Sequence, residues 1–380
     1  MKKYLLMAPG PTSIPPQVLL AMAKPVIHHR TAEFKAILQE INEGLQYVFQ
    51  TVNPVVMFSA SGTGAMEAAV VNTLARGDRA LVVRGGKFGE RWGELCEAYG
   101  VEATHIDVEW GHAVDPAEIK KALEKDPDIK AVFTTLCETS TCVRNDIEAI
   151  GKIVARHGAV LVVDAVSGLC AEELRTDEWA VDIVVTGSQK ALMLPPGLSF
   201  VSISDKAREL MKSSDLPKYY LSFEKALGSL AKTDTPFTSA VSLIYGLREA
   251  IALLREEGLE NVVYRHARLA EATREAARAL GLELFSKAPS NVATGIVMPS
   301  GIDAEKLRKI LSSDFNITVA GGQGNLKGNI IRVAHLGYCS ESDTITTISA
   351  LEMVLKRLGH ECGPGAGVAA AEGVFSRRAS

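Results

Sequence analysis

Between residues 55 and 205 the chain alternates short apolar segments with amphipathic ones, and this alternation restricts the fold more than any other feature. The apolar segments are rich in Val and Ile, as strands covered on both faces are. Strands that alternate with helices predict an α/β domain with a mostly parallel sheet covered by helices on both faces. The expected strands are residues 55–59, 80–84, 103–107, 130–135, 159–164, 181–187 and 198–203.

A second, smaller α/β pattern follows this region. Residues 239–281 predict one or two long helices with a candidate break at Gly258, and three short apolar runs then alternate with helical segments. The tail is rich in Gly, Ala and Ser, and we expect it to be disordered. The expected divisions are an N-terminal segment (1–20), a large domain (21–255), a small C-terminal α/β domain (256–360) and the tail (361–380).

The charge balance limits the classes of partner. Lys plus Arg number 41 and Asp plus Glu number 45, for a net charge of −4, without a long block of like charge. We therefore expect a small-molecule ligand, with neither nucleic acid nor a membrane as partner. No apolar run approaches the roughly 18 residues of a membrane-spanning helix. The 6 cysteines form no CxxC pair, which predicts reduced thiols, a cytoplasmic protein and no metal site.

Charged residues follow two of the expected strands, at the sheet edge where ligands of parallel sheets bind. Asp164 ends one apolar strand, and Lys190 follows another after a short polar turn. Burial of an unpaired ammonium is costly, so Lys190 is either a surface or ion-paired lysine or a chemical group. Asp164 is likewise either a turn or cap residue or a carboxylate that faces a ligand.

A third strand leads into Ser61-Gly62-Thr63 and a helix. Small and hydroxyl residues beside the free N–H groups of a helix N-terminus suit a phosphate, although they also suit an ordinary N-cap. The dinucleotide fingerprint is incomplete because Glu67 takes the place of its last small residue, and no GxxxxGK[ST] motif occurs. The segment Ser61-Gly62-Thr63 is therefore a candidate phosphate site, called the phosphate cup below. Together, this phosphate cup, a strand-end Asp and a strand-end Lys predict pyridoxal 5′-phosphate (PLP). This cofactor requires an amine, a carboxylate at its pyridine nitrogen and a phosphate site.

Eight motifs occur in an order that resembles the class V aminotransferases of PLP fold type I, nearest to their alanine/serine–glyoxylate (serine–pyruvate) branch. The resemblance covers residues 7–358, and although each motif alone is weak, all eight in order are specific. It implies a large PLP-binding domain with a mostly parallel sheet and a smaller C-terminal α/β domain. The motifs are APGPTSIPPQVLLAM, SASGTGAMEAA, GGKFGERW, ETST, VVDAVSG, TGSQKALMLPPG, LIYGLREA and IIRVAHLG.

The resemblance also implies how single residues bind PLP. Lys190 corresponds to the lysine that forms the Schiff base and moves the proton of the substrate α-carbon. Asp164 corresponds to the carboxylate that pairs with the pyridine nitrogen. The implied phosphate contacts are Ser61, Gly62, Thr63 and Gln189.

Further roles follow from the same resemblance. Thr139 would lie by the ring hydroxyl. Phe88 stands where the family stacks an aromatic side chain on the ring, although a core-packing Phe is the alternative. The resemblance implies a homodimer with shared active sites, in which Thr238 reaches the phosphate of the partner subunit. The mammalian glyoxylate enzymes carry a Tyr shortly before this Thr, and Thr235 takes its place here.

Two segments are implied in substrate binding. Arg332 corresponds to the arginine that holds the substrate α-carboxylate, a task that suits a planar guanidinium, while a surface Arg on an edge strand is the alternative. Gly10, in the loop of residues 9–12, would line the substrate site through backbone groups. Gly-rich residues 321–328 are a candidate loop that closes over the substrate.

The predicted function is PLP-dependent transfer of an amino group from a small L-amino acid to a 2-oxo acid, glyoxylate or pyruvate, by a ping-pong mechanism. Alanine or serine is the expected donor. Aspartate stays open, because His28, His29 and Arg30 are candidates to bind a side-chain carboxylate.

Two alternatives remain. A cysteine desulfurase requires a nucleophilic Cys before Arg332, but residues 320–328 contain none and Cys339 follows that arginine. A non-catalytic paralogue that serves as a structural subunit would be expected to lose Lys190, Asp164 or Arg332, and all three are present.

Overall fold

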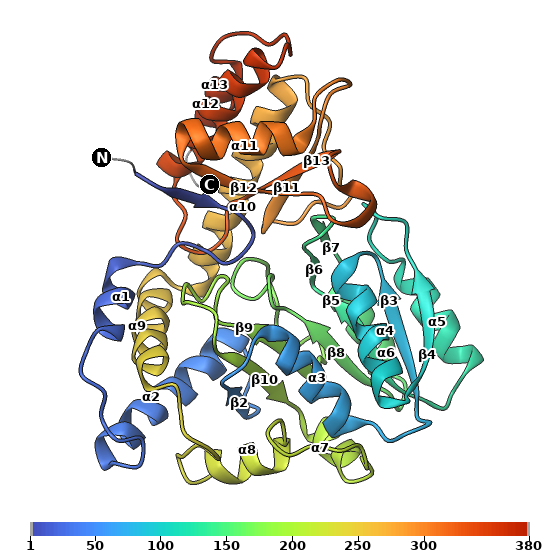
Figure 1. Cartoon of the computed structure of the whole chain (residues 1–380). Helices are drawn as coiled ribbons and strands as arrows, with labels where there is room; N and C mark the ends of the chain where they lie inside the picture. The colour runs from blue at the N-terminus through green and yellow to red at the C-terminus, as the bar shows by residue number, and fades with distance from the viewer. Residues whose placement is uncertain (1–2, 378–380) are drawn as a thin grey trace.

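The computed structural model describes residues 3–377 and contains two main sheets, each covered by its own helices (Figure 1). The larger sheet has the strand order β2-β10-β9-β8-β5-β3-β4. All neighbouring pairs from β9 to β4 are parallel, and only β10 runs against its two neighbours. The strands are β2 (Val55–Phe58), β3 (Arg79–Arg84), β4 (Glu102–Asp107), β5 (Ile129–Thr135), β8 (Val160–Asp164), β9 (Ile183–Gly187) and β10 (Ser199–Ile203). The predicted α/β architecture with a mostly parallel sheet is confirmed.

Helices cover both faces of this sheet because its central strands are apolar on both sides. Leu161 and Val163 of β8 face one apolar cluster, and Val160 and Val162 face another. This alternation is the two-residue period of a strand. One face carries α2 (Ala32–Phe49), α5 (Pro116–Lys125), α6 (Ile147–Val154) and α9 (Val241–Glu257), and the other carries α3 (Gly62–Thr73), α4 (Lys87–Tyr99), α7 (Asp205–Met211) and α8 (Phe223–Leu230).

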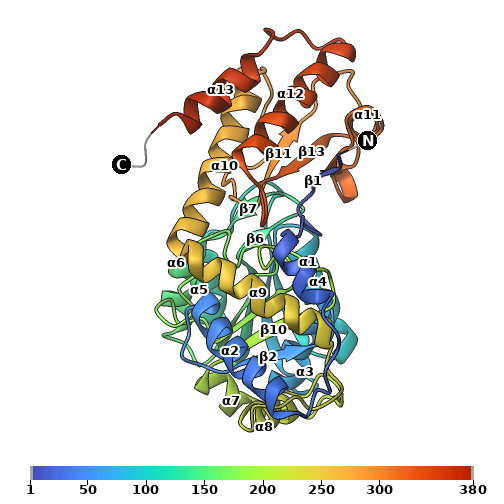
Figure 2. The ribbon, with the colours of Figure 1, turned by 90° about the vertical axis from the view of Figure 1, so that its left-hand side faces the viewer.

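The smaller sheet has the order β1-β12-β13-β11 and lies at one end of the molecule (Figures 1 and 2). Its first strand comes from the N-terminal segment: β1 pairs in parallel with β12, and helix α1 (Pro16–Met22) follows against α9. Sequence patterns did not predict this strand. The strands of this sheet are β1 (Leu5–Met7), β11 (Ala293–Val297), β12 (Ile317–Gly321) and β13 (Ile330–Ala334), and its neighbouring helices include α10 (Leu259–Ala279), α11 (Ala304–Phe315) and α12 (Glu341–Arg357).

Gly258 separates α9 from α10, as its sequence position suggests, and has a φ of 82°. The boundary predicted between residues 255 and 256 falls in the last turn of α9 and stays a proposal. No helix among residues 3–377 has the length and apolarity that crossing a membrane would require.

The expectation of a disordered tail is wrong for part of it. Residues 366–375 form helix α13 (Ala366–Phe375), which packs beside α10 and α12 (Figure 2). Ala371 and Val374 lie one turn apart and are buried with Ala272 and Ala276 of α10. Alanine favours helix, and its small side chain permits close approach of two helices. Residues 378–380 lie outside the described residues.

Candidate active site

Lys190 and Asp164 lie at the carboxyl ends of neighbouring parallel strands. Asp164 is the last residue of β8, and Lys190 follows β9 by three positions. Asp164 is 4% exposed, and its Oδ1 accepts a hydrogen bond of 2.8 Å from the backbone N–H of Val166. Burial raises the pKa of Asp164 to about 7 and lowers the pKa of Lys190 to about 8, while the attraction between the two groups opposes both shifts.

The N-terminal loop encloses Lys190. Lys190 Nζ donates to the carbonyl of Pro9, and Thr12 Oγ1 donates to the carbonyl of Lys190 at 2.9 Å. Gly10 has a φ of 134°, and a Cβ at that position would lie 2.6 Å from Cε of Lys190. The loop predicted to line the substrate site therefore contacts the lysine directly.

Ser61, Gly62 and Thr63, the predicted phosphate contacts, lie at the start of α3. Ser61 is the N-cap but its side chain makes no cap hydrogen bond, and no acidic residue lies in the first turn. A Cβ at Gly62 would lie 2.7 Å from Cγ2 of Val166, so the loop after β8 packs closely on this helix N-terminus. Among residues 3–377, Oε1 of Gln189 has no hydrogen-bond partner, and it is buried near Gly187 and the backbone N of Gly62. Because this oxygen is an acceptor, only the reversed amide, with its NH₂ group turned toward the helix N-terminus, would donate to an anion there.

Phe88 is held at the N-terminus of α4 by a buried carboxylate. Glu138 is 1% exposed and accepts hydrogen bonds from the backbone N–H of Phe88 at 3.1 Å and of Gly89 at 2.8 Å. The Glu138 side chain therefore caps α4 and fixes the direction in which Phe88 leaves the helix. Burial raises the pKa of Glu138, and the hydrogen bonds from Ser140 and from the helix backbone oppose that rise.

Arg332 and Thr139 meet at the junction of the two sheets. Thr139 follows β6 (Cys137–Glu138), which forms a small antiparallel pair with β7 (Val143–Arg144). Arg332 on β13 is 5% exposed and donates from Nη1 to the carbonyl of Thr139 at 2.7 Å and from Nε to the carbonyl of Gly321 at 2.8 Å. Burial lowers its pKa. Among residues 3–377, Nη2 makes no hydrogen bond, so this nitrogen of a fixed guanidinium is available to a ligand.

Thr238 is not brought to the other residues within one chain. It is exposed on the loop before α9, in a shallow depression with Tyr220 and Phe237. Thr235 uses its hydroxyl within this loop: it donates to the carbonyl of Phe237 at 3.0 Å and pairs with Ser239 Oγ at 2.6 Å. Contact between Thr238 and a partner subunit remains a prediction.

The candidate second carboxylate clamp is engaged elsewhere. Arg30 forms an ion pair with Asp234 and donates to the carbonyl of Thr235 at 2.6 Å. In the Gly-rich segment, Gly324–Leu326 forms a 3₁₀ turn, and Gly324 lies against Lys87, the first residue of α4, and Trp110, in the loop after β4. Closure of this loop over a substrate stays a prediction.

Two contacts of the site were absent from the sequence-based prediction. Thr139 Oγ1 donates to Ser167 Oγ at 2.7 Å, and Arg91 donates from Nη1 to Thr63 Oγ1 at 3.2 Å. Arg91 follows Phe88 by three positions in KFGERW, so helical spacing could have placed both on one face of α4.

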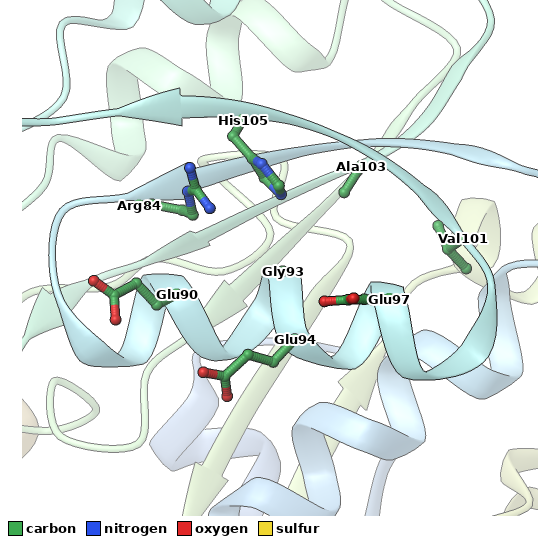
Figure 3. Close-up of a pocket in the computed structure, with 8 residues that line it drawn as sticks. All are labelled: Arg84, Glu90, Gly93, Glu94, Glu97, Val101, Ala103 and His105. Carbon is green, nitrogen blue, oxygen red and sulfur yellow. The ribbon is translucent and has the colours of Figure 1, made fainter.

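A separate surface pocket of about 430 Å³ lies along α4, β3 and β4 (Figure 3). Figure 3 shows Glu90, Glu94 and Glu97 of α4 there, with Arg84 and His105 on the strands. No predicted site residue lines it. Among residues 3–377, no group of three or more His, Cys, Asp or Glu side chains could hold a metal ion.

Comparisons with known proteins place this geometry among characterised folds. A family model described as Aminotransferase class-V matches residues 4–338. The "Soluble hydrogenase, small subunit" of Synechococcus sp. (strain PCC 6716) is 46% identical, over 98% of this chain and 99% of that protein. The serine–glyoxylate aminotransferase of Methylorubrum extorquens is 38% identical, over 96% of this chain and 94% of that protein. The crystal structure of the ureidoglycine–glyoxylate aminotransferase of Bacillus subtilis matches with a TM-score of 0.94 at 30% identity, over 99% of each chain.

Proposed function

The chain belongs to the class V aminotransferases, and we propose that it transfers the amino group of a small L-amino acid, alanine or serine, to glyoxylate or pyruvate. Enzymes of this family depend on PLP, which is the cofactor of this chain. The observation that carries the proposal is the placement of Lys190 and Asp164 on adjacent strand ends, beside a helix N-terminus whose N-cap side chain makes no cap hydrogen bond.

The residues present fit this cofactor. The buried carboxylate of Asp164 would hold the proton on the pyridine nitrogen, and Phe88 would cover one face of the ring. The first turn of α3, with Ser61 and Thr63, would bind the phosphate. A half-turn of the Gln189 amide would present its NH₂ group to the same phosphate and so satisfy a side chain that lacks a partner.

PLP supplies an aldehyde that joins to an amine and a ring that withdraws electrons from the bonds of the substrate α-carbon. The chain provides the acid–base group: Nζ of Lys190 would take the α-proton and return it. Its pKa of about 8 permits both protonation states near neutral pH, which is the property that a residue with both tasks requires. The loop at Pro9 and Gly10 lies against this amine and would help to hold it in place.

Arg332 would bind the substrate α-carboxylate through Nη2, the nitrogen that makes no hydrogen bond among residues 3–377. Two backbone carbonyls fix its plane, so the geometry exists before the substrate arrives. Arg30 is already paired with Asp234, which leaves it less suited to a second carboxylate and favours alanine or serine over aspartate. The name of the Methylorubrum relative supports serine as donor and glyoxylate as acceptor.

The proposed assembly is a homodimer in which Thr238 of one subunit completes the phosphate site of the other. Exposure of Thr238 supports this proposal, since its own chain leaves it at the surface. The proposed location is the cytoplasm, which the 6 free cysteines support.

The chemistry of the cysteines argues against a desulfurase. Cys339 lies beyond Arg332, and burial raises its pKa to about 12, so it would rarely be a thiolate. One relative is named as a hydrogenase subunit, so a structural role is the alternative that an activity assay must exclude. Amino transfer from L-serine or L-alanine to glyoxylate by the purified protein, lost in Lys190→Ala, is the expected result. No transfer from any L-amino acid to either acceptor would overturn the proposal.

A further inference from the structure

Arg91 connects two of the residues that would bind the cofactor. Its Nη1 donates to Thr63 Oγ1 at 3.2 Å, and its guanidinium carbon lies 5.0 Å from the centre of the Phe88 ring. Arg91 is half-buried, and among residues 3–377 no carboxylate lies within 4 Å of its side-chain nitrogens. A partly buried guanidinium without a direct ion pair is unusual, because no close contact with a carboxylate offsets its desolvation.

This lack of a partner is notable on a helix rich in acids. Glu90, Glu94 and Glu97 of α4 line the surface pocket with Arg84 (Figure 3), and Glu90 also pairs with Lys87 at 2.6 Å. Arg91 instead reaches α3, since its hydrogen bond is to Thr63.

The phosphate cup needs a positive charge that its own residues do not supply. Ser61, Gly62, Thr63 and Gln189 are all uncharged. The N-terminus of α3 contributes about half a unit charge, whereas a phosphate monoester carries between −1.5 and −2 at neutral pH. Arg91 is positioned to balance the remainder, and its charge also opposes the rise that burial causes in the pKa of Asp164.

We propose that Arg91 is a cofactor-positioning residue, which holds Thr63 and Phe88 in place and supplies positive charge to the phosphate cup. This inference rests on the proposed function, in which PLP binds beside Lys190. The ligand class it recognises is the phosphorylated pyridine, as opposed to the same ring without phosphate.

Pyridoxamine 5′-phosphate and pyridoxamine are the probes that test the proposal, because neither can bond covalently to Lys190. Their dissociation constants for the apoprotein are measured by calorimetry or fluorescence titration for wild type, Arg91→Gln and Arg91→Lys. Arg84→Gln is the matched control. Arg84 lies at the end of β3, beside α4, and pairs with Asp107. Among residues 3–377 it makes no hydrogen bond to a residue of the phosphate cup. Thermal melts and circular dichroism confirm that each variant is folded.

Arg91→Gln is expected to weaken pyridoxamine 5′-phosphate about 10- to 100-fold, the range of a charge-assisted contact, and pyridoxamine less than about 3-fold. Arg91→Lys should lose less, because the charge remains, and Arg84→Gln should match wild type. Equal weakening of both probes, or no weakening of either, would overturn the proposal while the PLP site stands. A wild-type protein that binds neither these probes nor PLP would instead contradict the proposed function.

Discussion

Gly10 and Lys190 are in contact, although 180 positions separate them in the sequence. A methyl group at Gly10 would overlap with the end of the Lys190 side chain, with 2.6 Å to Cε and 2.8 Å to Cδ. The N-terminal loop therefore lies against the proposed catalytic lysine, and it reaches that place because β1 pairs with β12 while Thr12 bonds to the backbone of residues 189 and 190. One short segment thus links the smaller sheet to Lys190.

Gly10→Ala should slow the capture of PLP by the apoprotein by at least about tenfold, since an added methyl would displace Lys190. Gly301→Ala is the matched control: Gly301 also has a positive φ, at 86°, but a Cβ there meets nothing within 4 Å. Both variants carry backbone strain of about 1–2 kcal/mol, and only the first should change PLP binding. Stopped-flow absorbance gives the rates, and equal rates in the two variants would contradict this account of the loop.

The rate of PLP capture should rise with pH around a midpoint of about 8, because only the neutral amine of Lys190 reacts. Burial lowers the pKa of this lysine from its usual 10.5 to about 8, so the ammonium form dominates below that value and the free amine above it. Rates measured from pH 6.5 to 10 give the midpoint, with Lys190→Ala as the blank. A rate that still climbs steeply near pH 10 would show that the lysine is not desolvated.

Asp164→Asn should stabilise the apoprotein at pH 8 and weaken its hold on PLP. The folded-state pKa of Asp164 is about 7 against a usual 3.8, so the folded state binds more protons between these values. Stability due to the protonated carboxyl is present below about pH 4 and is lost as the pH rises through 7. The Tm of Asp164→Asn should exceed that of wild type by at least about 3 °C at pH 8 and by less at pH 5. A difference that does not depend on pH would contradict this assignment.

Arg332→Lys should raise KM for the amino donor and lower kcat/KM by about 100-fold, because an ammonium cannot bind a carboxylate in the bidentate way of a guanidinium. Affinity for PLP should stay within about threefold of wild type, since none of the predicted contacts of Arg332 are with the cofactor. Arg274→Lys is the control for the loss of a guanidinium elsewhere in the fold, because Arg274 is half-buried and also donates to a carbonyl, that of Ser290. If Arg332→Lys lowers PLP affinity as much as kcat/KM, the substrate role is wrong.

The larger sheet and the position of the site could be predicted because both depend on local patterns. Val- and Ile-rich segments with a strand period fixed the large sheet, and the rule that ligands sit at strand ends placed Asp164 and Lys190 together. The roles predicted for these residues came from the resemblance of eight motifs in this chain to the class V aminotransferases. Thr238 and the dimer stay predictions, because a single chain does not contain the partner.

What escaped prediction depends on contacts between distant segments. Strand β1 is 3 residues long and forms only because β12, more than 300 positions away, offers an edge. Helix α13 has the composition of a flexible tail, and packing on α10 makes it a helix. Arg91 belongs to the motif GGKFGERW, but its hydrogen-bond partner Thr63 lies on another helix, and only the fold brings the two together.

The visible absorption spectrum of the PLP-loaded protein, before and after addition of L-serine, L-alanine or L-aspartate, tests the central claim most directly. The account predicts a band of bound PLP that is absent in Lys190→Ala, that disappears with serine or alanine and that returns when glyoxylate is added. A band that none of the three donors changes would contradict the proposed transaminase and favour a structural role. A protein that shows no band after incubation with PLP would contradict the assignment of Lys190.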